Sequence, residues 1–236
     1  MGEYGAKSSY VGETAERYLE TRQNDKKWKE EQKIVQKITD RHFARDQSIV
    51  DVPFGTGRFA KYYLRKGMKI YGVDISDDML SEAKKIVNNS SVEFIKGDAE
   101  SLPFKDGEID NVICVRLMNW VPIDILESFL KEFRRVSRSK IVVQVNVRTK
   151  RGLPRRAIMS LWNNPLNLAK SLYKALSRKK KKGTRKTKKR YHIHDEKDIF
   201  SLFERHGLEV QEEYTVREYL SWIMQPLKFY VLTRKA

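Results

Sequence analysis

The middle of the chain alternates short apolar runs with segments of helical periodicity, and this alternation constrains the fold more than any other feature. Strand-like runs occur at 48–52, 69–74, 92–97, 109–115 and 140–147. Such an alternation predicts an α/β fold in which parallel strands form a sheet with helices on both faces. The run 109–115 is almost entirely apolar, which is typical of a strand buried on both faces of such a sheet.

The end of the chain adds one helix and two strands to this pattern. Asp195 can cap a helix that runs to about His206, with Gly207 as its stop. Strand-like runs at 208–216 and 228–232 follow, and we expect them to pair antiparallel. The other helical patterns cover 14–40, 58–66, 77–88 and 124–138. Together they predict a doubly wound sheet of seven strands, mostly parallel with the last strand antiparallel, preceded by an N-terminal helix.

The net charge of +17 comes from a single segment. Residues 148–190 contain 17 basic residues and no acidic ones, whereas the remainder has 31 of each sign. We therefore expect a neutral domain with one cationic element that binds anions. The predicted organisation is an N-terminal helix and cofactor-binding part at 1–147, a basic amphipathic insertion at 148–193, and a C-terminal part at 194–236 that completes the same domain.

Several classes of protein are disfavoured by composition. The single Cys114 has no partner for an intramolecular disulfide, and no Cys/His cluster offers a zinc site. The N-terminus lacks the apolar core of a signal peptide, and no stretch reaches the ~18 apolar residues of a membrane span. We expect a metal-free cytoplasmic protein, with peripheral attachment to a membrane as the alternative.

The most informative motif is SIVDVPFGTGRFAKYY at 48–63. It reads as a strand, a turn with Gly55 and Gly57, and a helix, so a ligand can approach the backbone closely at a helix N-terminus. The next strand ends in Asp74, where an acidic side chain typically accepts hydrogen bonds from ribose hydroxyls. Asp98, in IKGDAESLPF, follows the third strand and can accept from an exocyclic amine.

This combination resembles the class I S-adenosylmethionine-dependent methyltransferases, which have a Rossmann-like fold. The resemblance implies S-adenosylmethionine as the cofactor. It implies that Asp51 orients the loop, Asp74 holds the ribose and Asp98 meets the adenine amine. Residues 10–28 resemble the leading helix of the family. Tyr18 and Arg22 lie on one face of this helix, and Arg22 could pair with the cofactor carboxylate. The other implied cofactor contacts are Gly55, Gly57, Ile75, Met79, Ala99, Cys114 and Val115.

Pro53 departs from the family pattern, because it replaces the first glycine of the usual loop. Proline has no N–H, so any contact expected from that amide is lost. Gly55 and Gly57 remain, and binding is still expected. A nicotinamide cofactor is the weaker alternative, since the segment around Asp98 has no equivalent role in a dehydrogenase.

No catalytic residue is evident, and methyl transfer from a sulfonium needs a general base only when the acceptor must lose a proton early. Cys114 lies within an apolar strand and reads as a core thiol. The candidates for lining the acceptor pocket follow the fourth strand and are Arg116, Asn119 and Trp120. Asn119 could orient a substrate group, and Trp120 could stack on a planar acceptor or simply pack against the next helix.

The basic segment leaves four interpretations of its role open. It could hold the phosphates of RNA, with tRNA or rRNA as the acceptor, and residues 10–28 also resemble wobble-uridine tRNA methyltransferases. It could instead bind an anionic membrane, the acceptor then being a small molecule, lipid, quinone or lipid-linked glycan. It could also be solvated only, or serve a non-catalytic RNA-binding subunit. The predicted anion-binding residues are Arg178, Lys179, Lys180, Lys181, Lys182, Arg185, Lys186, Lys188, Lys189 and Arg190.

Overall fold

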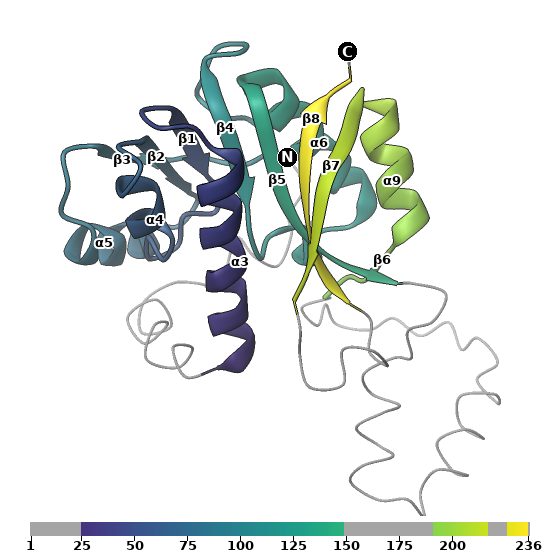
Figure 1. Cartoon of the computed structure of the whole chain (residues 1–236), viewed down its shortest axis with the longest axis horizontal. Coiled ribbons are helices and arrows are strands. Elements are labelled where there is room, and N and C mark those ends of the chain that lie inside the picture. Colours follow the sequence, from purple (N-terminus) through teal and green to yellow (C-terminus); the bar gives the residue numbers. More distant parts are fainter. Residues whose placement is uncertain (1–24, 149–190, 217–225, 236) are drawn as a thin grey trace, which may run out of the picture.

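The computed structural model describes residues 25–148, 191–216 and 226–235 (Figure 1). The predictions for Tyr18, Arg22 and the basic residues 178–190 lie outside the described residues, as does the start of the predicted N-terminal helix.

Within the described residues, the strands form one mixed sheet with the order β3-β2-β1-β4-β5-β8-β7, and a short β6 pairs with β5. The strands are β1 (Ser48–Asp51), β2 (Lys69–Asp74), β3 (Val92–Lys96), β4 (Ile109–Cys114), β5 (Ser137–Arg148), β6 (His194–Asp195), β7 (Leu208–Thr215) and β8 (Leu227–Arg234). Strands β1 to β5 pair in parallel, while β8 lies antiparallel between β5 and β7. The predicted doubly wound α/β sheet and its antiparallel last strand are confirmed.

Helices cover both faces of this sheet, and their bounds refine the sequence prediction. They are α3 (Lys26–His42), α4 (Ala60–Leu64), α5 (Asp77–Ile86), the 3-10 turn η1 (Met118–Trp120), α6 (Ile123–Val136) and α9 (Glu196–Arg205). Helix α4 is shorter than the predicted 58–66, because Arg58 and Phe59 remain in the turn after β1. Side chains cap two helix starts, since Asp25 accepts from Lys27 N and Ser76 accepts from Met79 N.

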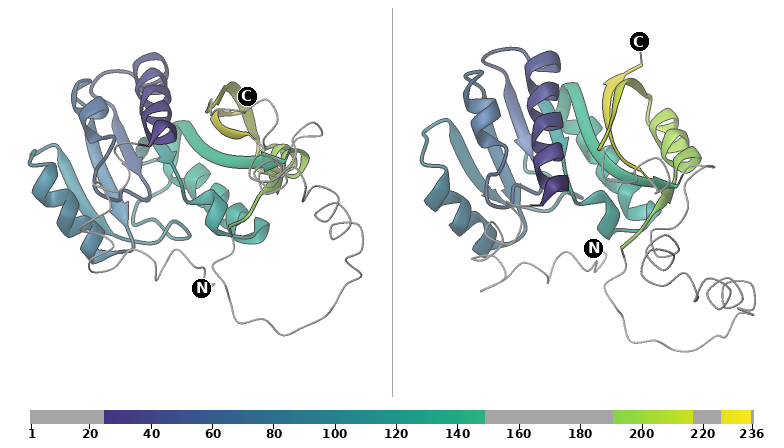
Figure 2. Two further views of the ribbon diagram at one scale, coloured as in Figure 1. Left: turned by 90° about the horizontal axis from the view of Figure 1, so that it is seen from below. Right: turned by 60° about the horizontal axis from the view of Figure 1, so that its bottom comes forward.

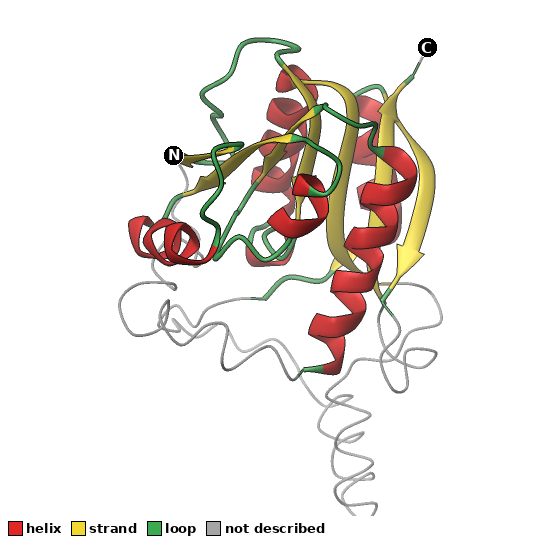
Figure 3. Ribbon diagram, turned by 60° about the vertical axis from the view of Figure 1, so that its left-hand side comes forward, coloured by secondary structure: helices red, strands yellow, loops and turns green. Residues whose placement is uncertain are grey.

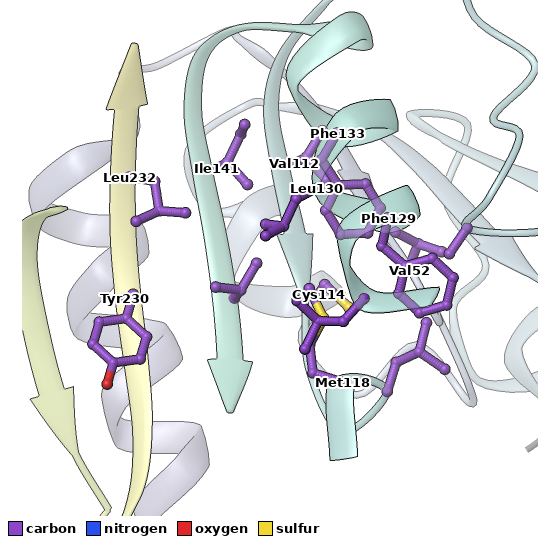
Figure 4. Packing of buried hydrophobic residues seen from close by; sticks show 14 of the residues in the cluster. Val52, Val112, Cys114, Met118, Phe129, Leu130, Phe133, Ile141, Tyr230 and Leu232 are labelled. Atoms are coloured by element: carbon purple, nitrogen blue, oxygen red, sulfur yellow. The ribbon is translucent and has the colours of Figure 1, made fainter. Parts of the chain in front are cut away.

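Two hydrophobic clusters lie on opposite faces of the sheet. One includes α3, α4 and α5, and the other includes α6 and α9. The left view of Figure 2 shows the sheet between α3 and α6, and Figure 3 shows α3 crossing one face. In Figure 4, Phe129, Leu130 and Phe133 of α6 pack over β4 and β5. This burial of apolar surface stabilises the sheet and fixes where its strand ends lie.

Strand β6 is a feature that the sequence analysis did not predict. Its two residues pair in parallel with the end of β5, Val147 with His194 and Arg148 with Asp195. Strand β5 is also longer than the predicted 140–147, because it begins directly after α6. The pairing brings residue 148 and residue 191, which flank the basic segment, to the same end of the sheet.

Candidate active site

A cavity lies at the carboxyl ends of the parallel strands, which is where ligands bind in open α/β sheets. It contains about 880 Å³ of empty space, a volume that includes solvent space at its opening. Its walls come from the segments that follow β1, β2, β3 and β4, and from the first turn of α3. The lining residues are Trp28, Val52, Pro53, Phe54, Gly55, Thr56, Arg58, Phe59, Asp74, Ile75, Ser76, Met79, Gly97, Asp98, Ala99, Val115, Arg116, Leu117 and Trp120.

Asp74 lies at the end of β2 and is held by backbone groups. Its Oδ2 accepts from Gly55 N at 2.8 Å, and its Oδ1 accepts from Ser76 N at 3.0 Å. A carboxylate has about four lone-pair positions, so one remains for a ligand hydroxyl beside the backbone hydrogen bonds from Gly55, Ile75 and Ser76. Burial raises the pKa of Asp74, although the backbone hydrogen bonds oppose the rise. The carboxylate is thus oriented in the wall with acceptor capacity to spare.

The turn after β1 depends on two left-handed glycines, which take different roles. Gly55 has a φ of +58° and lines the cavity, where its missing side chain leaves room for a ligand. Gly57 has a φ of +73° and does not line the cavity, and a Cβ there would lie 2.6 Å from Val87 Cγ2. Gly55 is therefore placed for ligand contact, whereas Gly57 permits close packing of the turn against the end of α5.

Pro53 lines the cavity. The bulky Phe54 that follows it has room because residue 72 of β2 is a glycine. A Cβ on Gly72 of β2 would lie 2.6 Å from the Phe54 ring, so that ring packs where only a glycine leaves space. Phe54 N donates to Val73 O at 2.8 Å, which ties the turn to β2. Gly72 of the neighbouring strand therefore leaves the space that the Phe54 ring occupies.

The structure also brings the other predicted contacts of β2, β3 and β4 to the same cavity. Asp98 and Ala99 follow β3, and Ile75 and Met79 follow β2. Asp98 Oδ1 accepts from Glu100 N at 3.2 Å, which orients it by a local backbone bond. Val115, directly after β4, lines the wall as well.

Two predicted contacts lie behind the wall rather than in it. Cys114 is fully buried in the cluster under α6, because side chains alternate along β4 and its neighbour Val115 takes the opposite face. Burial raises the pKa of the Cys114 thiol well above its usual range. Asp51 lies beneath the turn and accepts from Tyr63 OH at 3.3 Å, and burial raises its pKa as well. Their predicted direct contacts with a ligand find no support in this geometry.

Two arginines that face α3 also line the cavity, Arg58 after β1 and Arg116 after β4, whereas Asp74 and Asp98 follow β2 and β3. Arg58 stacks on Trp28 with its guanidinium carbon 3.5 Å from the ring centroid, and Arg116 lies over the same ring at 5.0 Å. Glu31 of α3 accepts from both guanidinium groups at 2.9 Å. Sequence reasoning named Arg116 but missed the other three. The one available signal was the spacing of Trp28 and Glu31, three residues apart, which places both on one face of the predicted helix.

Trp120 lines the cavity, whereas Asn119 does not. The Trp120 ring meets Tyr191 edge to face, with centroids 5.7 Å apart. Asn119 is buried, its Oδ1 accepts from Asn146 N, and its carbonyl accepts from His192 N, each at 2.7 Å. The side chain of Asn119 thus holds the end of β5, and a contact of Asn119 with a substrate stays a prediction.

Metal ligation and membrane crossing both lack candidates among the residues that the structure describes. No group of three or more His, Cys, Asp or Glu side chains could hold a metal ion there. In that same part of the chain, no helix combines the length and apolarity that a membrane crossing requires.

Residues 49–140, which supply most of the cavity, match the family model for a methyltransferase domain. This part of the chain is thus similar to known methyltransferase domains. The match confirms the sequence-based resemblance to Rossmann-like, S-adenosylmethionine-dependent methyltransferases. The chain outside this range carries α3, β6, α9, β7 and β8.

Curated relatives match this domain over part of their length. A malonyl-[acyl-carrier protein] O-methyltransferase from Hamiltonella defensa is 34% identical over 95 residues, which cover 40% of this chain and 35% of that protein. A 23S rRNA (uracil(747)-C(5))-methyltransferase from Pyrococcus abyssi is 35% identical over 68 residues, which cover 28% of this chain and 17% of that protein. The chain thus aligns with about a third or less of these relatives.

A solved structure is similar over almost the whole chain. The magnesium protoporphyrin IX methyltransferase of Synechocystis PCC 6803, crystallised with bound S-adenosylhomocysteine, superposes with a TM-score of 0.68 at 14% identity. The superposition covers 98% of both chains. These three proteins act on an acyl-carrier protein, an rRNA and a porphyrin, so the shared domain does not specify the acceptor.

Proposed function

We propose that the protein transfers a methyl group from S-adenosylmethionine. The observation that carries this proposal is the convergence of Gly55, Asp74 and Asp98 on one cavity at the ends of three neighbouring strands. Asp74 has acceptor capacity for the ribose hydroxyls, Asp98 for the adenine amine, and Ile75 and Met79 provide an apolar wall for the adenine ring. The residues present therefore fit this cofactor.

The protein's contribution to such a reaction is positioning. The bound cofactor supplies an activated methyl group on its sulfonium, and displacement requires the acceptor atom to lie in line with that bond. Val115, Leu117 and Trp120 follow β4 and form the wall beside the turn, so they delimit where an acceptor can enter. Their mostly apolar side chains exclude water from the reacting atoms.

Isothermal titration with S-adenosylmethionine tests the cofactor directly. We expect saturable binding with one site per chain. Absence of detectable heat and of competition by S-adenosylhomocysteine would reject the enzymatic function and favour a non-catalytic, RNA-binding subunit.

For the acceptor, we propose RNA, held by the basic segment between residues 148 and 191. The residues that flank this segment support the proposal, because they are held by β6 and by the turn after β4, and Tyr191 contacts Trp120 of the cavity lining. Arg148 and Asp195 pair across β5 and β6, and His192 N donates to Asn119 O at 2.7 Å. Tyr191 directly follows the basic run and is 46% exposed.

These positions suit a nucleic acid on physical grounds. Lysine and arginine bind phosphates without regard to sequence, and aromatic side chains such as Tyr191 and Trp120 stack on unpaired bases. The relative from Pyrococcus abyssi that modifies 23S rRNA is consistent with RNA as acceptor. An acceptor bound by the segment would approach the same end of the sheet at which the cavity opens.

Methyl transfer to total RNA and to a lipid extract separates the two acceptor classes. We expect transfer to RNA that declines steeply with added salt, because each phosphate contact releases counterions. Replacing 178–190 with a neutral linker of equal length should abolish most of this transfer, while a scrambled segment of the same charge should retain it. Transfer to the lipid fraction alone would instead favour a membrane-associated methyltransferase, and unchanged rates in both variants would remove the segment from substrate binding.

A further inference from the structure

A row of basic side chains runs along the solvent-facing side of α3, the helix that crosses one face of the sheet in Figure 3. Lys29, Lys33, Lys37 and Arg41 follow one another at intervals of four residues, and all four are exposed. Four residues advance about 6 Å along an α-helix and return to nearly the same side, so these cations form one continuous ridge, the α3 row. The buried residues of α3 are Trp28, Glu31, Val35, Ile38 and Thr39.

Helix α4 lies beside α3 and adds two exposed cations, Lys61 and Arg65. The turn before α4 contacts the first turn of α3, because the Arg58 guanidinium lies 3.5 Å from the centroid of the Trp28 ring. After α4, Lys66 Nζ donates to two carbonyl groups in the last turn of α3, each at 2.8 Å. The two helices therefore form one surface, the basic face, which consists of Lys29, Lys33, Lys37, Arg41, Lys61 and Arg65.

The neutral charge balance outside residues 148–190 conceals this surface. That part of the chain contains 31 basic and 31 acidic residues. Within it, residues 26–42 and 60–65 together contain eight Lys or Arg and three Asp or Glu, a formal net charge of +5. One of the three acidic residues, Glu31, is fully buried. The part of the chain that is neutral in total is thus polarised, with α3 and α4 on its positive side.

Two cations of the α3 row pair with acidic side chains at the surface. Lys33 Nζ lies 2.8 Å from Glu30, and Arg41 Nη1 lies 3.0 Å from Glu212. The Lys33 side chain is nevertheless 73% exposed and that of Arg41 59%. Exposed pairs of this kind contribute little free energy, because water and salt compete with them. A phosphate group can therefore replace such a partner at small cost.

The α3 row is held in one geometry before any ligand binds. Trp28, Val35 and Ile38 anchor the helix from its first turn to its last, each at most 3% exposed. His42 Nε2 lies 2.8 Å from Glu212 Oε2 and joins the end of α3 to β7. A preorganised row of cations binds a chain of phosphates without first having to order the helix, which reduces the entropic cost of association.

The surroundings of the basic face favour a nucleic acid over a membrane. A helix that lies in a membrane interface inserts an apolar side, whereas the apolar side of α3 is packed in the core. Among the described residues, the exposed large hydrophobic side chains are Ile86, Ile123, Tyr191 and Phe200, and none of them belongs to α3 or α4. Phosphates, in contrast, require only cations that follow the backbone.

We propose that the basic face is a second RNA-binding surface, which holds the backbone of the acceptor RNA beside the cavity. This inference rests on the proposed function, with RNA as the acceptor, and deepens it. Trp28 lines the cavity and directly precedes Lys29, so a strand that follows the α3 row reaches the cavity at the first turn of the helix. Contacts with phosphates supply affinity and orientation, but they do not read the sequence of the RNA.

Binding of RNA by the full chain tests the proposal without any need for catalysis. The variant replaces Lys29, Lys33 and Lys37 by Gln and keeps Arg41, because Arg41 also pairs with Glu212. Fluorescence anisotropy of a labelled single-stranded RNA is measured over a series of salt concentrations. We expect the affinity to fall at least tenfold, and the slope of log affinity against log salt to become shallower by about 2, since each phosphate contact with a single strand contributes about 0.7.

Two further variants are matched to this one. Lys131→Gln, Arg134→Gln and Lys197→Gln together remove the same charge from exposed positions of α6 and α9, on the opposite face of the sheet, and should leave the affinity and the slope unchanged. Arginine at positions 29, 33 and 37 keeps the charge and should retain the affinity. Every variant should bind S-adenosylhomocysteine as the wild type does, because none of the substituted residues lines the cavity.

The single variant Lys33→Gln serves if the triple variant does not fold, as judged by circular dichroism, and its slope should then change by about 0.7. Equal losses in the variant of the opposite face would show that affinity follows total charge, which overturns the proposal. Unchanged affinity on loss of the α3 lysines, with a loss when 178–190 is replaced by a neutral linker, would overturn it too. That result would confine RNA binding to the basic segment and leave the proposed function standing.

Two outcomes with the wild type also contradict the proposal. Binding to phosphatidylglycerol vesicles but not to RNA, lost on substitution of the α3 lysines, would assign the basic face to a membrane. Absence of binding to RNA and to vesicles, with S-adenosylhomocysteine still bound, would reject RNA as the acceptor and retain the cofactor. Failure to bind S-adenosylhomocysteine would instead reject the proposed methyl transfer itself.

Discussion

Two parts of the cavity wall, an acidic end with Asp74 and Asp98 and an arginine end with Arg58 and Arg116, are built in different ways. At the acidic end, Asp74 and Asp98 directly follow their strands, and backbone N–H groups at most 19 residues away along the chain orient them. At the arginine end, Arg58 and Arg116 are held by Glu31, which is 27 and 85 residues away. One end therefore depends on local turns, and the other on contacts that exist only once α3 has packed on the sheet.

This difference explains why the two ends should respond differently to mutation. A turn that depends on its backbone conformation is disturbed when a left-handed glycine is replaced or when the carboxylate that accepts its N–H group is removed. A buried ionic cluster is sensitive to any loss of one partner, because the remaining charge is left uncompensated. Substitutions at each end separate these behaviours, and the largest effect is expected at the glycine turn.

The turn at the acidic end should be broken by Gly57→Ala. The new Cβ would combine a left-handed φ of +73° with a contact of 2.6 Å to Val87. We expect the free energy of unfolding in urea to fall by about 3 kcal/mol. Gly107→Ala is the matched control, since Gly107 has a φ of +64° but a Cβ added there would meet nothing within 4 Å; it should cost only about 1 kcal/mol. Equal losses would show that packing against Val87 is unimportant.

Loss of the orienting carboxylate at the acidic end should abolish most ligand binding. In Asp74→Ala, we expect two ligands to bind about 100-fold more weakly, S-adenosylhomocysteine and methylthioadenosine, the second of which lacks the amino acid group. The reason is that the ribose loses its acceptor and Gly55 N loses its partner. Asp110→Ala is the control, because Asp110 also accepts from a backbone N–H, that of Ser48, at the amino end of β4. It should reduce stability without changing either affinity, and a comparable loss of affinity would contradict the assigned role of Asp74.

The arginine end should be loosened by Gln144→Met, which keeps the volume of the side chain but removes both of its hydrogen bonds. We expect the free energy of unfolding to fall by about 2 kcal/mol, because Arg116 N loses its acceptor. Binding of S-adenosylhomocysteine should weaken as well, since Arg116 lines the cavity. Asn111→Leu, at another fully buried polar site, removes a hydrogen bond to Gln47 and should affect stability only. Equal weakening of binding by Asn111→Leu would argue that the effect comes from lost stability alone.

The smallest expected effect is a dependence of binding on pH that comes from the acidic end. Burial raises the pKa of Asp74 above its usual 3.8, so this carboxylate takes up a proton at a higher pH than an exposed aspartate does. The ionised form accepts the ribose hydroxyls, so affinity should be full at neutral pH and should decline as the pH falls through the raised pKa. Titrations of both ligands should show the same decline, and Asp74→Asn should remove it. A decline that persists in Asp74→Asn would assign the titration to another group.

Most of the fold and the acidic end could be predicted from the sequence. Both depend on features that can be recognised in a window of a few residues: the alternation of strand and helix patterns, the two glycines and Asp74. The direction of two side chains could not be predicted from the local pattern. Val115 lines the cavity while Cys114 packs in the cluster with α6, as the core-thiol interpretation expects. The Asn119 side chain accepts from Asn146 N, a partner that is distant in sequence.

The sequence by itself determined the α/β architecture, the turn after β1 and the location of the positive charge, since these follow from local periodicity and composition. Only the tertiary structure decided that Glu31 accepts hydrogen bonds from two arginines. It also decided that β6 pairs with the end of β5 and that Trp120 contacts Tyr191. The physical reason is that a buried charge or a strand pair is stabilised by its partner, and the partner is chosen by the packing of helices and strands from distant parts of the chain.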